Sequence, residues 1–276
     1  MAVWFITGVS TGLGRALAEA ALARGDAVHG TVRSVAASAA FSALGPGAKP
    51  VHLDVTDEAA LTQAVHEAGP IDILVNNAGY GLAGAVEETS LAEARAQFEV
   101  NVWAPLAAIR AVLPDMRARG QGHIINITSA SGIAVWPGTG IYCASKFALE
   151  AIGRSLREEV RDFGIAVTNV APGGLRTDYA GRSLVRTDTA IPAYAGGAGH
   201  AAQEILAGHA GHEPGDPARA AAAIIAIAGR ADAPRHLLLG DDALHYAERE
   251  LVLIAADINA HRDVSLAISF PDEVTA

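Results

Sequence analysis

Short apolar segments alternate with segments of helical periodicity along most of this 276-residue chain. Residues 3–7 form an apolar run that ends at a glycine turn, as buried parallel strands do, and residues 12–24 follow with apolar side chains at helical spacing. This order predicts an α/β fold, namely a Rossmann-type, doubly wound parallel sheet of about seven strands with helices on both faces. The later strands are expected at 27–32, 51–55, 71–75, 123–128, 165–170 and 236–239, and the later helices at 57–66, 91–117, 141–163, 217–227 and 243–258.

The length favours a single domain that spans residues 1–276, and no linker interrupts the pattern. The pattern weakens at residues 178–215, and a long irregular insert in a compact domain is typical of a lid or binding loop. Residues 241–276 form a C-terminal extension, whose tail after Val264 is expected to be loosely ordered. Pro105, inside the long helical segment, predicts either a kink or a boundary there.

The charge of the chain and its cysteine content limit the classes of partner and the cellular location that can be expected. The net charge is −10 and no basic run is present, which argues against nucleic acid and anionic membranes. Cys143 is the one cysteine, so the chain builds no disulfide framework, and a reducing, cytoplasmic location is expected. No signal peptide is expected, because Met1 leads directly into an apolar strand, and no apolar run reaches the ~18 residues of a membrane span. A small molecule remains as the expected partner.

A glycine-rich turn follows the first expected strand. The sequence TGVSTGLG places Gly8, Gly12 and Gly14 between that strand and the next helix. Backbone N–H groups at such a helix N-terminus bind pyrophosphate, and glycine allows the cofactor to approach the backbone closely. Because this cluster opens a strand–helix–strand unit, it predicts a dinucleotide-binding site.

The end of the second expected strand bears on the cofactor's adenosine ribose. An acidic residue there would accept a hydrogen bond from the 2′-hydroxyl of NAD. This chain has Val32 at that position and Arg33 after it. A guanidinium suits a 2′-phosphate, so the sequence predicts a preference for NADP(H), with NAD(H) still open. The alternative is that Arg33 is an ordinary surface arginine.

Tyr142 and Lys146 lie four residues apart in the segment IYCASKFAL, so they share one face of the expected helix. Free tyrosine has a pKa of ~10, and a neighbouring ammonium lowers that value. The pair is therefore suited to proton transfer.

The ordered motifs resemble those of the short-chain dehydrogenase/reductases of the compact, single-domain type. The resemblance covers about residues 3–180. The segments GTVRS and YCASKFALE are similar to those of the branch that contains 17-beta-hydroxysteroid dehydrogenase type 1, and the enzymes of this branch favour NADP(H). The motifs are TGVSTGLG at 7–14, LDV at 53–55, NNAG at 76–79, Asn101 in VNVWAP, Ser129 in NITSASG, YCASK at 142–146 and PGGLRT at 172–177.

This resemblance implies four catalytic residues. Tyr142 is expected to be the general acid or base, and Lys146 to hold the nicotinamide ribose and lower the tyrosine pKa. Ser129 is expected to donate a hydrogen bond to the substrate oxygen, and Asn101 to fix a water that connects Lys146 to solvent.

The resemblance also implies the contacts with cofactor and substrate. Tyr142 and Lys146 are expected to contact the cofactor, and Ser129, Trp136 and Tyr142 the substrate, an apolar ketone or aldehyde, with steroid or retinoid specificity resting on analogy alone. The other cofactor contacts are Gly8, Ser10, Thr11, Gly12, Leu13 and Gly14 at the phosphates, Arg33, Asp54 and Val55 at the adenosine, Asn76, Ala78 and Gly79 at the inner ribose, and Pro172, Gly173 and Thr177 at the nicotinamide amide.

The expected function is thus reversible hydride transfer between NADP(H) and a carbonyl/alcohol pair. The alternative is an NADP(H)-binding sensor without turnover, which would have no need for the Ser129, Tyr142 and Lys146 set. No metal is expected, because the histidine spacing in the insert matches no compact metal motif. Relatives commonly form homodimers or homotetramers, and the sequence does not choose between these and a monomer.

Overall fold

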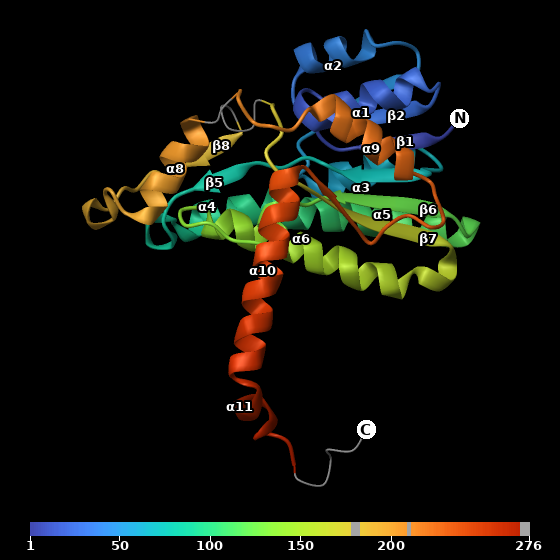
Figure 1. The fold of residues 1–276 in the computed structure, drawn as a ribbon. Helices are drawn as coiled ribbons and strands as arrows, with labels where there is room; N and C mark the ends of the chain where they lie inside the picture. Colours follow the sequence, from blue (N-terminus) through green and yellow to red (C-terminus); the bar gives the residue numbers. More distant parts are fainter. Residues whose placement is uncertain (178–182, 209–210, 271–276) are drawn as a thin grey trace.

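The computed structural model describes residues 1–177, 183–208 and 211–270. Within these, a parallel seven-stranded sheet with the order β3-β2-β1-β4-β6-β7-β9 forms the centre of the molecule (Figure 1). The order reverses direction next to β1, which makes the sheet doubly wound and confirms the predicted Rossmann-type α/β fold. Its strands are β1 (Val3–Ile6), β2 (Ala27–Val32), β3 (Ala48–His52), β4 (Ile73–Asn76), β6 (Gly122–Ile127), β7 (Ile165–Pro172) and β9 (His236–Leu239).

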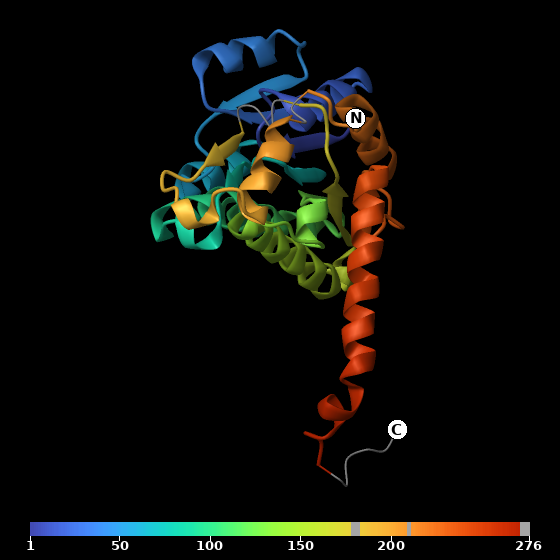
Figure 2. The same ribbon diagram turned by 60° about the vertical axis from the view of Figure 1, so that its left-hand side comes forward.

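Helices cover both faces of this sheet (Figures 1 and 2). One face packs on α1 (Gly12–Ala23), α2 (Val35–Ser42) and α9 (Pro217–Ile227). The other packs on α3 (Glu58–Glu67), α5 (Ala104–Arg119) and α6 (Gly140–Glu159). Further helices in the described ranges are α4 (Leu91–Phe98), α8 (Ala198–Gly208), α10 (Asp241–Ala260) and α11 (Arg262–Leu266), and a short second sheet pairs β5 (Gly81–Ala83) with β8 (Leu184–Arg186).

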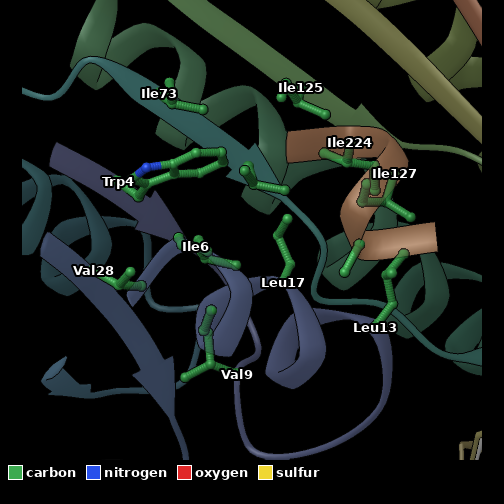
Figure 3. Packing of buried hydrophobic residues seen from close by; sticks show 14 of the residues in the cluster. Trp4, Ile6, Val9, Leu13, Leu17, Val28, Ile73, Ile125, Ile127 and Ile224 are labelled. Atoms are coloured by element: carbon green, nitrogen blue, oxygen red, sulfur yellow. The ribbon is translucent and has the colours of Figure 1, made fainter. Parts of the chain in front are cut away.

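Successive side chains of the first strand enter opposite halves of the core, as the two-residue period of a strand requires. Trp4 and Ile6 pack with Leu17 of α1 and Ile224 of α9 (Figure 3), whereas Phe5 packs on the α3 and α5 side. All of these are fully buried. Because both faces of the sheet are covered, its central strands carry apolar side chains on both sides, and this is why the sequence shows them as largely apolar runs. The polar residues within these strands, such as Asn76, Asn126 and Asn169, are buried as well.

Two differences from the sequence prediction lie near the first crossovers. The third strand is Ala48–His52, so the motif at residues 53–55 follows the strand, where it was expected to belong to the strand. Helix α2 was not predicted, although Ser34 caps its N-terminus by accepting a hydrogen bond from Ala37 N at 3.1 Å. Its alanine-rich, weakly amphipathic sequence gave no periodic signal.

The long helical segment expected at 91–117 is divided. Helix α4 ends at Phe98, a π-helical turn spans Glu99–Trp103, and α5 begins at Ala104. Pro105 has no N–H to donate to the carbonyl of residue 101, so the regular helical bonding is interrupted there. Of the two outcomes that the proline predicted, the structure shows the boundary, and Asn101 lies in the turn.

The described part of the insert at residues 178–215 is more ordered than expected, since it contains β8, a turn at Pro192–Tyr194 and α8. Residues 178–182 and 209–210 of that prediction lie outside the described residues. Glu88 is 2% exposed and holds the insert by accepting hydrogen bonds from Ile191 N at 2.8 Å and His200 Nε2 at 2.9 Å. Glu93 accepts another from Asp188 N at 2.9 Å. A short acidic segment thus anchors the insert.

The C-terminal extension consists of α10 and α11. Only the start of α10 packs on the domain, and the rest projects away from it (Figures 1 and 2). Helix α11 continues to Leu266, two residues into the tail that was expected to be loosely ordered, and residues 271–276 of that tail lie outside the described residues. No helix in the described ranges combines the length and the apolar character needed to cross a membrane.

Candidate active site

All seven strands run in parallel, so their carboxyl ends meet at one edge of the sheet. In open α/β sheets this edge, at the reversal of strand order, is where ligands bind. The loops after β1, β4, β6 and β7 lie there, and they carry most of the predicted site residues. The fold therefore gathers motifs that are distant in sequence.

The loop between β1 and α1 is shaped for close contact with a ligand. Gly8 and Gly12 have φ values of 75° and 62°, in the left-handed region that favours glycine. A Cβ atom on Gly14 would overlap the Gly8 carbonyl oxygen and the Asn77 side chain. Thr11 is the N-cap residue of α1, and its side chain makes no capping hydrogen bond with the described residues. The first N–H groups of α1 thus remain available, and the loop fits a dinucleotide pyrophosphate.

Three polar residues that sequence analysis did not assign to the site hold this loop. Thr31 Oγ1 accepts a hydrogen bond from Gly8 N at 2.8 Å. Asn77 Nδ2 donates to the carbonyl oxygens of Thr7 and Gly8, both at 2.9 Å. Thr7 Oγ1 accepts from the N–H groups of residues 77 and 78 at 2.9 and 3.0 Å. The two asparagines after β4 signal only a turn, and the threonines resemble other strand residues, so the sequence offered no usable sign of this support.

We expect Gly14→Ala to reduce NADPH affinity at least tenfold and to destabilise the fold by about 1–3 kcal/mol, since the added methyl group displaces the Gly8 carbonyl or Asn77. Gly208→Ala is the control, because a Cβ atom there meets no atom within 4 Å. Calorimetric titration and thermal unfolding measure the two effects. Unchanged NADPH binding by Gly14→Ala would show that the loop does not hold the cofactor.

The predicted adenosine residues lie at the ends of β2 and β3. Arg33 and Asp54 are exposed, whereas Val55 is 7% exposed and belongs to the core. Asp54 accepts hydrogen bonds from Thr56 N at 3.0 Å and Thr56 Oγ1 at 2.8 Å. The Thr56 backbone bond chiefly lowers the pKa of Asp54, with a further contribution from the charge of Arg33. The guanidinium therefore acts at the same end of the sheet as the phosphate loop.

Helix α6 buries Tyr142 and Lys146 at its N-terminal end. Tyr142 is 9% exposed and Lys146 is 6% exposed. Lys146 Nζ lies 5.9 Å from the centre of the Tyr142 ring and donates a hydrogen bond to the Ile127 carbonyl at 2.9 Å. Burial lowers the pKa of Lys146 to about 8. An ammonium that titrates near neutral pH thus lies beside a buried phenol.

Asn101 joins this helix to the loop after β4. Its Nδ2 donates to the Tyr80 carbonyl at 3.0 Å and to Ser145 Oγ at 3.1 Å. A Cβ atom placed on Gly79 would lie 3.1 Å from Asn101 Oδ1 and 3.6 Å from Lys146 Nζ. Asn101, Gly79 and Lys146 are therefore neighbours, and the π-helical turn directs the asparagine to them. Its water-binding role stays a prediction.

Ser129 follows β6 and begins a turn at Ala130–Gly132. Its Oγ accepts a hydrogen bond from Ser131 N at 3.0 Å. The turn packs directly on α6, since a Cβ atom on Gly132 would lie 3.1 Å from the Lys146 carbonyl oxygen. The fold thus brings the serine loop against the part of α6 that carries Lys146.

Asn76 differs from the simple expectation of a cofactor contact. Its side chain is 2% exposed and donates to Asn126 Oδ1 at 2.9 Å, and Asn126 donates in turn to Asn169 Oδ1 at 3.1 Å. Asn76 Oδ1 has no hydrogen-bond partner among the described residues. The amide groups form a ladder across β4, β6 and β7, so a cofactor contact by Asn76 would be made by its backbone. The neighbouring Ala78 and Gly79 face the site more openly.

The loop after β7 is held by a residue that the sequence did not single out. Asp242, in the first turn of α10, accepts a hydrogen bond from Gly174 N at 2.7 Å. Gly173 packs so closely on the same carboxylate that a Cβ atom would overlap it, and Gly173 N donates to the Leu239 carbonyl at 2.9 Å. At the far end of this loop, Thr177 reaches Gly12, with 3.6 Å between its side chain and the Cβ position of that glycine. The loop thus bridges α10 and the phosphate loop.

Trp136 is half-buried in the loop before α6. Its ring packs edge-on against Tyr246 of α10, with 5.0 Å between ring centres. Gly138, in the same loop, lies against the backbone of Gly199 in α8. The insert and α10 therefore both contact the loop that was predicted to bind substrate. In the described ranges, no group of three His, Cys, Asp or Glu side chains is placed to hold a metal ion.

Comparisons with known proteins identify the family of this chain. The profile of the family described as short chain dehydrogenase matches residues 2–186. Oxidoreductase BOA17 of Botryotinia fuckeliana is 38% identical, over 96% of this chain and 98% of that protein. The crystal structure of a short-chain dehydrogenase from Streptomyces avermitilis is 38% identical and aligns with a TM-score of 0.90, over 98% of this chain and 100% of its own.

A more distant structure carries a cofactor. A short-chain dehydrogenase from Burkholderia cenocepacia, solved in complex with NADP, is 27% identical and aligns with a TM-score of 0.70 over 100% of this chain and 98% of its own. The profile match and the full-length relative establish the family. This chain belongs to the short-chain dehydrogenase/reductases, and it is an oxidoreductase that acts on CH–OH groups with NAD(P) as acceptor.

Proposed function

We propose that this enzyme interconverts an apolar ketone or aldehyde and its alcohol by hydride transfer with NADP(H), and that Tyr142 is the general acid or base. The observation that carries the proposal is the burial of Tyr142 beside the Lys146 ammonium, on a helix packed against the Ser129 loop. Cys143, the chain's one cysteine, is free and buried, which suits a reaction in the cytoplasm.

Each residue has one task in this mechanism. NADP(H), when bound, supplies or takes up the hydride. In the reducing direction the substrate oxygen gains negative charge; Ser129 donates a hydrogen bond to it, and Tyr142 delivers the proton. Lys146 holds its positive charge near the phenol, which stabilises the phenolate left after proton transfer. Asn101, through its contacts with Tyr80 and Ser145, keeps the loop after β4 against this helix.

Arg33 supports the preference for NADP(H), because an exposed guanidinium beyond β2 suits a 2′-phosphate. We expect Arg33→Ala to weaken NADPH binding roughly ten- to hundredfold, as the loss of a charge-assisted hydrogen bond does, and to leave NADH binding nearly unchanged. Arg219→Ala is the control, since that side chain is 90% exposed on α9. Titration with both cofactors measures the effect. Equal affinity of the wild type for both, unaltered in Arg33→Ala, contradicts the assignment.

The substrate class is tested by NADPH oxidation with a panel of ketones and aldehydes of increasing apolar size. Trp136, in the loop predicted to bind substrate, packs on the Tyr246 ring, and this aromatic pair suits an apolar substrate, so we expect kcat/KM to rise with apolar size. No oxidation with any carbonyl, despite tight NADPH binding, would favour the alternative of a cofactor sensor.

Asp242 is expected to be a positioning residue for the cofactor, because it holds the loop at residues 172–174. We expect Asp242→Ala to raise the KM for NADPH about five- to fiftyfold while kcat changes less than threefold, and Asp242→Asn to restore part of the affinity. Glu248→Ala, at an exposed acid further along α10, is the control. A parallel loss of kcat and thermal stability without a change in KM would indicate a merely structural role.

A further inference from the structure

The projecting part of the C-terminal extension exposes an unusual amount of apolar surface. We define the arm as residues 251–270, all of which are exposed, whereas Ala243 and Ala247 at the start of α10 are buried. The arm carries nine large apolar side chains with exposed fractions from 48% to 87%. They are Leu251, Val252, Leu253, Ile254, Ile258, Val264, Leu266, Ile268 and Phe270.

This surface is too large for a solvated terminus. At on the order of 100 Å² of apolar area per side chain, the nine present roughly 900 Å². The largest apolar patch of a typical monomer is about 300–600 Å². One partner of a standard protein interface buries about 800 Å². Leu251, Val252, Leu253 and Ile254 are consecutive and so lie on all sides of the helix, which means that a single contact covers only part of this area.

Charge argues for a protein partner over an anionic membrane. The arm and the turn before it carry four acids, Glu248, Glu250, Asp257 and Asp263, against two arginines, Arg249 and Arg262. Helices that lie on membranes are rich in basic residues, and this chain as a whole has a net charge of −10. Neither feature suits a lipid surface.

The pattern of the arm favours a second copy of itself. Leu251, Ile254 and Ile258 lie at positions i, i+3 and i+7, so they form one apolar stripe along α10. An antiparallel pair about a two-fold axis matches this stripe with its own copy, as isologous interfaces require. It also brings the acids at the start of one arm, Glu248 and Glu250, towards Arg262 at the end of the other.

We propose that the arm is a dimerisation surface, in which the α10 helices of two copies of this chain pair side by side and antiparallel. When Leu251 of one copy lies opposite Ile258 of the other, Ile254 faces Ala255, and the two-fold axis passes between them. Ala255 borders the apolar stripe, because it lies four residues after Leu251. Ala256 lies on the opposite side of the helix.

Two measurements test the pairing on the full-length protein. Sedimentation velocity from low to high micromolar concentration is expected to show a dimer for the wild type and a monomer for Leu251→Asp/Ile254→Asp/Ile258→Asp. All three side chains are exposed in the single chain, so the substitutions spare its core. A monomeric wild type, or a triple variant that remains dimeric, overturns the proposal. Monomeric wild type that floats with phosphatidylcholine vesicles would assign the arm to a membrane surface instead.

The register is tested by a matched pair of cysteine variants. Mild oxidation is expected to join the chains of Ala255→Cys at least tenfold faster than those of Ala256→Cys, because Ala255 lies next to the two-fold axis on the contact side of the helix, whereas Ala256 lies on the opposite side. The wild type, in which the native Cys143 is buried, gives the background rate of cross-linking. Equal rates for the two variants would contradict the antiparallel pairing.

Discussion

Tyr142→Phe is expected to lower kcat for carbonyl reduction by about 10²- to 10⁴-fold, the range that general acid catalysis contributes. The substitution removes only the hydroxyl, and the ring keeps its buried place beside Lys146. NADPH affinity should therefore change less than threefold, so the loss should be confined to the chemical step. Steady-state kinetics with NADPH and an apolar ketone, together with direct titration of NADPH, measure both quantities.

Cys143→Ala is the matched control for this variant. Cys143 is the next residue of α6, is buried, and has Sγ 3.4 Å from Thr139 Oγ1. Replacing it disturbs the same turn of the helix without touching the phenol, so near-normal turnover is expected. Comparable losses in the two variants would mean that the tyrosine effect is structural, and full activity of Tyr142→Phe would remove it from the mechanism.

Lys146→Met is expected to lower kcat/KM by at least about 10²-fold, since the variant keeps the volume and loses the ammonium that stabilises the phenolate. Burial sets the pKa of this lysine at about 8 in the free protein. Below that pH the side chain is charged, and above it the charge is lost. The kcat/KM of the wild type should therefore fall as pH rises through about 8.

Lys146→Arg separates this effect from a general loss of stability. An arginine stays charged throughout the accessible pH range, so any activity that it retains should not decline at about pH 8. Thermal unfolding at each pH excludes denaturation as the cause. A wild-type profile that is flat from below pH 8 to well above it would contradict the role given to this lysine.

The sequence predicted the architecture well because the signals were local. Most strands of the sheet contain a short apolar run, and most helices show their periodicity, so the order of elements could be predicted. Helix α2 was missed, since an alanine-rich helix has no apolar stripe to detect. The break at Asn101 was only half predicted, because Pro105 signals an interruption and not its π-helical form.

The site was predictable to a smaller extent, for a physical reason. Residues such as Gly14 and Lys146 belong to local motifs and could be named from the sequence. Their supports are tertiary: Thr31 holds the phosphate loop from a neighbouring strand, and Asp242 holds the loop after β7 from a helix 68 residues away. No local pattern distinguishes such a threonine or aspartate from an ordinary strand or helix residue. Asn76 shows the converse, because its motif suggested a cofactor contact and the fold buries its side chain in an inter-strand ladder.

The most direct test of the central claim follows the hydride itself. The enzyme would be given NADPH that carries deuterium at both C4 positions of the nicotinamide, together with the best ketone of the panel, and the products would be analysed by mass spectrometry. The account predicts one deuterium on the carbinol carbon of the alcohol for each NADPH oxidised. Product without the label, or NADPH that is bound and never consumed, would contradict it.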